Sequence, residues 1–191
     1  MNAEAFADYK RLSRSFQAQK LVSYCGVASS VSVLNALGVE TDQYDFFIEG
    51  TEQVRPWNKV MFGGMALTDL AGLLAEHGVQ VSIHHADQFS LNEFRAAVKS
   101  NLKTEHDYLI VNYQREVLTQ GKVGHISPLS AYDHESDSVL IMDTAAHKYP
   151  PTWVPLKLLY AAMKTIDSSS EKMRGFVEVS KRGLSRKDIS D

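Results

Sequence analysis

Cys25 is the only cysteine of the chain, and it stands directly before Gly26 at the start of an apolar segment with helical spacing. A thiol at the N-terminus of a helix lies near unpaired backbone N–H groups and the positive end of the helix dipole, which favour the thiolate. Because a thiolate attacks carbonyl carbons, Cys25 is a candidate nucleophile. A lone cysteine among valines and alanines is also a common small core residue, so position alone leaves both interpretations open.

A nucleophilic thiol needs a base, and the base needs a group that orients it. Of the seven histidines, His84 and His85 are adjacent on a predicted strand and point to opposite faces, so they cannot bind one metal as a pair. Four others stand beside loop or turn residues, where solvated surface is expected. His125 opens an apolar strand, and Asp143 ends the next one, where an acid without a partner would be costly. If these strands form a hairpin, Asp143 can orient the His125 imidazole toward Cys25.

Gln19 precedes Cys25 by six residues. Its side-chain amide can donate an N–H to the oxygen of a carbonyl that the thiol attacks. Taken by itself it is an ordinary surface glutamine, and a Cys, His, Asp order arises by chance in many proteins.

The elements that must position these residues follow from the apolar periodicity. The segment after Cys25 predicts a helix that stops at Gly38, Thr68 is predicted to cap a later helix, and Ser90 with Glu93 predicts a capping box. The best strand patterns are VQVSI (79–83), YLIVNY (108–113), HISPLSAY (125–132), SVLIMD (138–143) and RGFVEVS (174–180). Helices come first and strands later, which predicts an α+β fold with an antiparallel sheet packed against the helix that Cys25 begins.

Length and composition predict one globular domain over residues 1–191, with a charged tail after about residue 180. The net charge of −3 comes without a basic run, which argues against nucleic-acid or anionic-membrane binding. One cysteine excludes an intrachain disulfide and a metal site with several thiolates. With no apolar leader and no run of eighteen apolar residues, a cytoplasmic location away from the membrane is expected.

Four segments, in this order, resemble the catalytic domain of phytochelatin synthase, a glutathione γ-glutamylcysteinyltransferase of the papain-like cysteine peptidase clan. They are YCGVASSVSVLNALG, GHISPLSAYDHESDSVLIMDTA, KYPPTWVPLKLLYAAM and IDSSSEKMRGFV, and the likeness runs from about residue 16 to residue 179. The resemblance implies a papain-like fold. It also implies that Cys25 is the nucleophile, His125 the general base and acid, Asp143 its orienting group, and Gln19 the oxyanion donor beside the Cys25 backbone N–H.

The same resemblance assigns residues to substrate binding. Asp167 and Arg174 match an acid and an arginine that hold the amine and carboxylate of the γ-glutamyl head, although an ordinary surface ion pair would have the same sequence. Arg115 and Lys148 match basic residues associated with a second substrate in the plant enzymes.

The implied reaction cleaves the Cys–Gly bond of glutathione or its S-conjugates through a γ-glutamylcysteinyl thioester. Water resolves the thioester in the main, and a second glutathione does so less often, which is phytochelatin synthesis. The short form resembles the bacterial members, and no cysteine-rich C-terminal domain of the eukaryotic kind is expected. Ala146 stands where the plant proteins commonly have arginine, which argues against the acceptor contacts of the plant enzymes. No cofactor is expected. Heavy-metal ions are expected to act only as glutathione thiolate complexes, and a homodimer is left open.

Three other functions stay open from the sequence. A general papain-like cysteine peptidase would share the triad but prefer α-linked peptides. A non-catalytic thiol-binding or metal-binding protein would bind ligand and release no glycine. A different cysteine acyltransferase would use another acyl donor.

Overall fold

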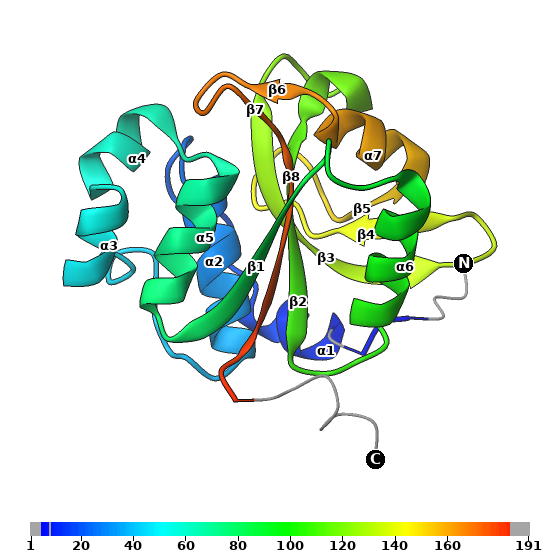
Figure 1. Cartoon of the computed structure of the whole chain (residues 1–191). Helices are drawn as coiled ribbons and strands as arrows, with labels where there is room; N and C mark the ends of the chain where they lie inside the picture. The colour runs from blue at the N-terminus through cyan, green and yellow to red at the C-terminus, as the bar shows by residue number, and fades with distance from the viewer. Residues whose placement is uncertain (1–4, 8, 184–191) are drawn as a thin grey trace.

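The structure is a computed structural model that describes residues 5–7 and 9–183. Its main sheet has the strand order β1-β8-β2-β3-β4-β5, and all neighbouring strands are antiparallel (Figure 1). The strands of this sheet are β1 (Val79–His85), β2 (Asp107–Gln114), β3 (Gly124–Asp133), β4 (Ser138–Ile141), β5 (Thr152–Pro155) and β8 (Gly175–Lys181). A small hairpin, β6 (Ile166–Asp167) with β7 (Lys172–Met173), precedes β8.

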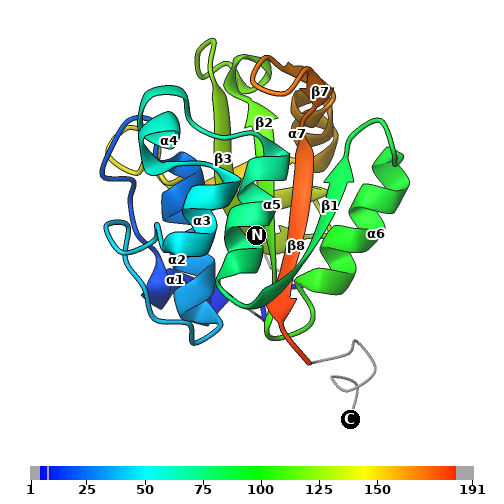
Figure 2. The same ribbon diagram turned by 60° about the vertical axis from the view of Figure 1, so that its left-hand side comes forward.

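Helices cover both faces of the sheet, as the two views in Figures 1 and 2 show. They are α1 (Tyr9–Ser15), α2 (Cys25–Ala36), α3 (Glu49–Val54), α4 (Trp57–Gly63), α5 (Leu67–Glu76), α6 (Leu91–Asn101), the 3₁₀ helix η1 (Arg115–Leu118) and α7 (Leu156–Met163). The side chains of β2 alternate between two cores: Tyr108 and Ile110 pack with α2 and α5, whereas Leu109 and Val111 pack with α6 and α7. The predicted α+β class is confirmed. None of the described helices has the length and apolar character that crossing a membrane requires.

Helix α2 begins at Cys25, as predicted, and is buried on nearly every side. Small residues allow this close packing: a Cβ added at Gly26 would overlap the thioether of Met65. The Ser29 hydroxyl donates to the Ile126 carbonyl at 3.1 Å, which joins α2 to β3. The predicted stop is also confirmed, because Gly38 has a φ of +83°, a conformation that favours glycine. The predicted packing of this helix against an antiparallel sheet is therefore correct.

Of the two predicted helix caps, one is confirmed and the other is wrong. Ser90 and Glu93 form the predicted capping box, with the Ser90 N–H donating to the Glu93 carboxylate at 2.7 Å. Thr68 is not a cap: helix α5 already begins at Leu67, and the Ala66 N–H donates to the carboxylate of Asp69 at 2.9 Å. An acid in the first turn thus binds the N–H of the residue before the helix, and no threonine side chain caps this helix.

The β3–β4 hairpin forms with the predicted turn between Asp133 and Asp137. Its register ends with the Met142 N–H donating to the Pro128 carbonyl at 2.9 Å. The chain leaving β4 therefore returns to the start of β3, where His125 lies. Strand β8 continues to Lys181, past the predicted start of the charged tail, and the rest of that tail, from residue 184, lies outside the described residues.

Candidate active site

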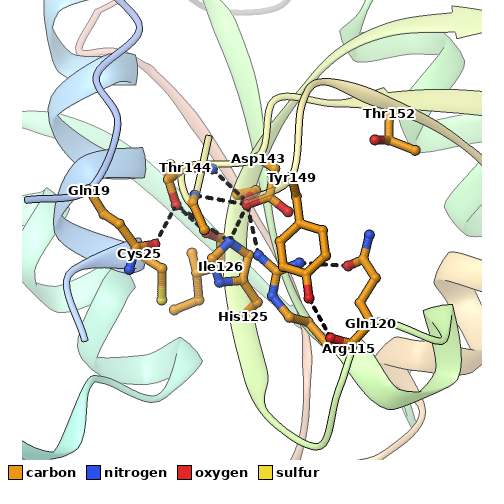
Figure 3. Close-up of polar contacts among 12 residues, drawn as sticks. Gln19, Cys25, Arg115, Gln120, His125, Ile126, Asp143, Thr144, Tyr149 and Thr152 are labelled. Atoms are coloured by element: carbon orange, nitrogen blue, oxygen red, sulfur yellow. Dashed lines mark hydrogen bonds and ion pairs between the residues drawn. The ribbon is translucent and has the colours of Figure 1, made fainter. Parts of the chain in front are cut away.

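Cys25 at the start of α2 faces His125 at the start of β3, and the two side chains are close enough for the imidazole to act on the thiol (Figure 3). Burial by itself would raise the pKa of the Cys25 thiol, but the bond to His125, its charge and nearby backbone groups outweigh burial and lower that pKa. The pKa of His125 shifts the other way, because its bonds to Asp143 and Cys25 outweigh a burial effect that would lower it. These opposite shifts favour a thiolate beside an imidazolium.

Asp143 accepts a hydrogen bond from the other side of the same imidazole, with 2.9 Å between His125 Nε2 and Asp143 Oδ1. The Nδ1 atom is therefore the ring nitrogen left to face Cys25. Burial would raise the pKa of Asp143, but its bonds to His125 and Arg115 lower it to about 2. The carboxylate is ionised at neutral pH and can hold the imidazole in one orientation.

Gln19 lies beside Cys25, and its side chain is fully hydrogen-bonded (Figure 3). Its amide nitrogen donates to the carbonyls of Leu21 and Val22 at 2.9 and 2.7 Å, and its amide oxygen accepts from Thr144 Oγ1 at 3.3 Å. The structure brings Gln19 to the expected place. To bind an oxyanion, however, the side-chain amide must break one of its hydrogen bonds to the Leu21 or Val22 carbonyl and turn that N–H toward the oxyanion.

Thr144 is a residue that the sequence reasoning missed. Its hydroxyl lies 3.3 Å from the Gln19 amide oxygen and 3.5 Å from His125 Nε2, and its carbonyl accepts the Gln19 N–H at 2.8 Å. It connects the segment before α2 to the sheet. A threonine directly after Asp143 carries no periodicity or spacing signal that would have marked it.

Asp167 and Arg174 are both buried, so the structure does not show the ordinary surface ion pair. The Arg174 guanidinium lies 3.9 Å from the Asp167 carboxylate and donates to the Ile166 carbonyl at 2.6 Å. The Asn112 amide donates to the other Asp167 oxygen at 3.0 Å. A charged pair held in place from both sides can bind a zwitterionic group.

Arg174 also lies against the strand that carries the base. A Cβ added to Gly124, next to His125, would stand 2.8 Å from Arg174 Nη2, so a side chain there would force the guanidinium to move. The Arg174 Nε has no hydrogen-bond partner among the described residues, although it is buried. This unpartnered donor is suited to a ligand carboxylate.

Arg115 and Lys148 differ in their surroundings. Lys148 is exposed, with its ammonium 5.2 Å from the centre of the Tyr149 ring. Arg115 is buried, and its Nη2 donates to Asp143 Oδ1 at 2.7 Å. The guanidinium thus lies against Asp143 instead of facing outward toward a second substrate. No cluster of three or more His, Cys, Asp or Glu side chains that could hold a metal occurs within residues 5–7 and 9–183.

Comparisons with known proteins identify the family of the chain. A family model described as phytochelatin synthase matches residues 1–176. The chain is 37% identical over 177 residues to "Glutathione gamma-glutamylcysteinyltransferase 1" of Arabidopsis thaliana, covering 90% of this chain and 36% of that protein. It is 29% identical over 178 residues to "Glutathione gamma-glutamylcysteinyltransferase" of Schizosaccharomyces pombe, covering 89% of this chain and 42% of that protein. The chain thus spans well under half the length of these relatives.

One solved structure is similar in outline. It is described as a double glycine motif protease from an AMS/PCAT transporter in complex with the leader peptide, and it is 14% identical, with a TM-score of 0.49, covering 86% of this chain and 89% of that one.

Proposed function

The chain belongs to the phytochelatin synthase family, and on that premise we propose that it transfers the γ-glutamylcysteinyl group of glutathione through a thioester on Cys25. The observation that carries the proposal is the series Cys25, His125 and Asp143, in which the thiol faces the imidazole and Asp143 Oδ1 lies 2.9 Å from His125 Nε2 (Figure 3). This series supplies a nucleophile, a base and an orienting acid in the order that acyl transfer needs.

Acylation starts with the thiolate of Cys25, whose proton has passed to His125. The sulfur attacks the carbonyl carbon between cysteine and glycine of glutathione, and the carbonyl electrons move onto oxygen. When the tetrahedral intermediate collapses, the C–N bond breaks and His125 Nδ1 gives its proton to the amine of the departing glycine. The product is a γ-glutamylcysteinyl thioester on Cys25.

The negative oxygen of the tetrahedral intermediate needs hydrogen-bond donors. We assign this task to the Cys25 backbone N–H, which belongs to the first turn of α2 and has no acceptor within the helix, and to the Gln19 amide. The Gln19 amide would turn one N–H from the Leu21 or Val22 carbonyl toward the oxyanion.

Asp167 and Arg174 are assigned to the γ-glutamyl head, with the carboxylate of Asp167 on its amine and the guanidinium of Arg174 on its carboxylate. Two observations support this assignment: both side chains are buried, with Arg174 beside Gly124, and the Nε of Arg174 has no hydrogen-bond partner among the described residues. A charged ligand bound there would extend from the start of β3 toward Cys25.

Water or the α-amine of a second glutathione then attacks the thioester, with His125 taking the proton of the attacking group. Hydrolysis is expected to dominate, because water at roughly 55 M needs no dedicated contacts whereas a second tripeptide must be ordered by binding. The exposed ammonium of Lys148 can offer the second glutathione a weak contact. Heavy-metal ions are assigned the role of substrate components, as thiolate complexes of glutathione.

The test is to incubate the protein with glutathione and follow glycine, γ-glutamylcysteine and longer thiol peptides, with mass spectrometry of the Cys25 peptide. The expected result is glycine release together with a γ-glutamylcysteinyl adduct on Cys25, both lost in Cys25→Ala because the chain has no second thiol. An adduct at another residue would overturn the proposal.

Two further arms separate the alternatives. A panel of α-linked peptides should be cleaved poorly, whereas efficient cleavage would indicate a general cysteine peptidase. An S-alkylated glutathione should release glycine without added metal, and strict metal dependence with that substrate would contradict the assigned role of the metal.

A further inference from the structure

Arg115 is a buried cation at the triad. Its side chain and that of Asp143 are each 3% exposed, and 2.7 Å separates Arg115 Nη2 from Asp143 Oδ1. A buried charge is tolerated only with a close partner, because removing an unpaired ion from water is very unfavourable. The two residues therefore depend on each other for their charged states.

Three donors meet at one oxygen of Asp143. Oδ1 accepts from Arg115 Nη2 at 2.7 Å, from His125 Nε2 at 2.9 Å and from the Ala145 N–H at 2.9 Å. The other oxygen has the Tyr113 hydroxyl at 3.4 Å. Donors on several sides leave the carboxylate little freedom to rotate, so the direction of the His125 bond is set partly by Arg115.

Arg115 is itself held by the loop between η1 and β3 and by the segment after Asp143. Its Nη1 donates to Gln120 Oε1 at 2.6 Å, and its guanidinium stacks 4.3 Å from the centre of the Tyr149 ring. The Tyr149 hydroxyl donates in turn to the Gln120 carbonyl at 2.5 Å. Figure 3 shows the guanidinium between the Tyr149 ring and Asp143. These contacts point the guanidinium inward.

The positive charge of Arg115 also balances the charges of the other site residues. When Cys25 is a thiolate and His125 an imidazolium, the ionised Asp143 leaves these three side chains with one net negative charge, on the buried side of the site where Asp143 lies. The guanidinium of Arg115 neutralises that charge inside the protein, where solvent cannot do so.

We propose that Arg115 is a positioning residue of the acyl-transfer site: it holds Asp143 ionised and oriented, and through Asp143 it fixes His125 toward Cys25. The role does not involve contact with a second substrate. The inference rests on the proposed function, since it concerns the base of that reaction.

The test compares Arg115→Met and Arg115→Lys with Arg95→Met, a matched control. Arg95 makes an ion pair with Asp137 at the turn of the β3–β4 hairpin, at the opposite end of β3 from His125. Arg115→Met should lower kcat for glycine release by about 10-fold to 100-fold while KM for glutathione stays within about 2-fold. The acid limb of the kcat/KM profile should move up by about one pH unit, because a positive charge that favours the ionised site is gone.

Arg115→Lys should have a kcat and an acid limb between those of the wild type and Arg115→Met, because lysine keeps the positive charge but matches the geometry of the arginine contacts less well. Arg95→Met should leave both unchanged. If Arg115→Met instead raised KM, or lowered only the longer thiol peptides while kcat and the acid limb stayed as in the wild type, the positioning role would be wrong. If Arg115→Met does not fold, Gln120→Met is the substitute test, because it keeps the arginine and removes one of the side chains that hold it. The acid limb of its kcat/KM profile should move to higher pH, by less than one unit. An acid limb that stays where it is in the wild type would then count against the proposal.

A readout without glutathione separates this inference from the proposed function. The rate of Cys25 alkylation by iodoacetamide against pH reports the thiolate directly. Its profile should move to higher pH in Arg115→Met and stay in place in Arg95→Met, even if glutathione proved not to be the substrate. An unchanged profile in Arg115→Met would overturn the positioning role alone.

Discussion

Two Arg–Asp ion pairs flank strand β3, one at each end, and they differ mainly in burial. At the turn of the β3–β4 hairpin, the Nε and Nη2 atoms of Arg95 each lie 2.8 Å from an oxygen of Asp137, a bidentate contact. At the candidate active site, Arg115 touches one oxygen of Asp143 at 2.7 Å. The side chains of the outer pair are 28% and 38% exposed, whereas those of the inner pair are each 3% exposed.

The outer pair has the better geometry, yet the inner pair is expected to matter more. Water can replace either partner of an exposed pair, so the net gain is small. No such replacement exists for the inner pair, and loss of one partner leaves an uncompensated buried charge. Burial, more than the number of hydrogen bonds, decides which of the two pairs can control a neighbouring histidine.

The largest difference should appear in activity. Asp143→Asn removes the charge that orients and stabilises the protonated His125, so glycine release should fall by roughly 10²-fold to 10⁴-fold, although by less than in His125→Ala. Asp137→Asn should stay within about 2-fold of the wild type, because it weakens only an exposed pair. Steady-state rates with glutathione measure both. Equal losses in the two variants would mean that the pairs act through general stability.

The next largest difference should appear in stability. Arg115→Met leaves a buried carboxylate with fewer partners and should lower the free energy of unfolding by about 3–5 kcal/mol. Arg95→Met should lower it by at most about 1 kcal/mol. Urea denaturation of both variants at pH 7 checks this, and similar changes in the midpoint would contradict the role assigned to burial.

The smallest difference should be seen in acid. The pKa of Asp143 is lowered from 3.8 to about 2, so its ionisation contributes stability that is present above pH 4 and is lost as the pH falls toward 2. A shift of this size corresponds to about 2 kcal/mol. Between pH 5 and pH 3 the wild type should therefore lose more stability than Asp143→Asn, which has no such proton to bind.

Asp137→Asn is the control for the acid experiment. The pKa of Asp137 is also lowered, chiefly by its bond to Arg95, but its side chain is accessible to solvent and the linked stability is expected to be smaller. Removing Asp137 should leave most of the acid sensitivity in place. If Asp137→Asn flattened the pH dependence more than Asp143→Asn, the comparison of the two pairs would be reversed.

The sequence alone was sufficient for features that depend on neighbouring residues. Apolar spacing predicted the helix from Cys25, Gly38 ended it, and the turn after Asp133 predicted the hairpin that brings Asp143 back to His125. These features are encoded locally, by helical periodicity, by a conformation that favours glycine and by a short connection between two strands.

Only the tertiary structure decided which polar residues are buried and what they contact. Arg115 could have been an outward-facing substrate ligand, and it lies against Asp143 because the loop after η1 and the ring of Tyr149 direct it inward. Thr144 touches both Gln19 and His125 only because α2 and the sheet pack together. Such contacts join segments far apart in the chain, and the surrounding protein, not the local pattern, determines how much solvent each charge loses.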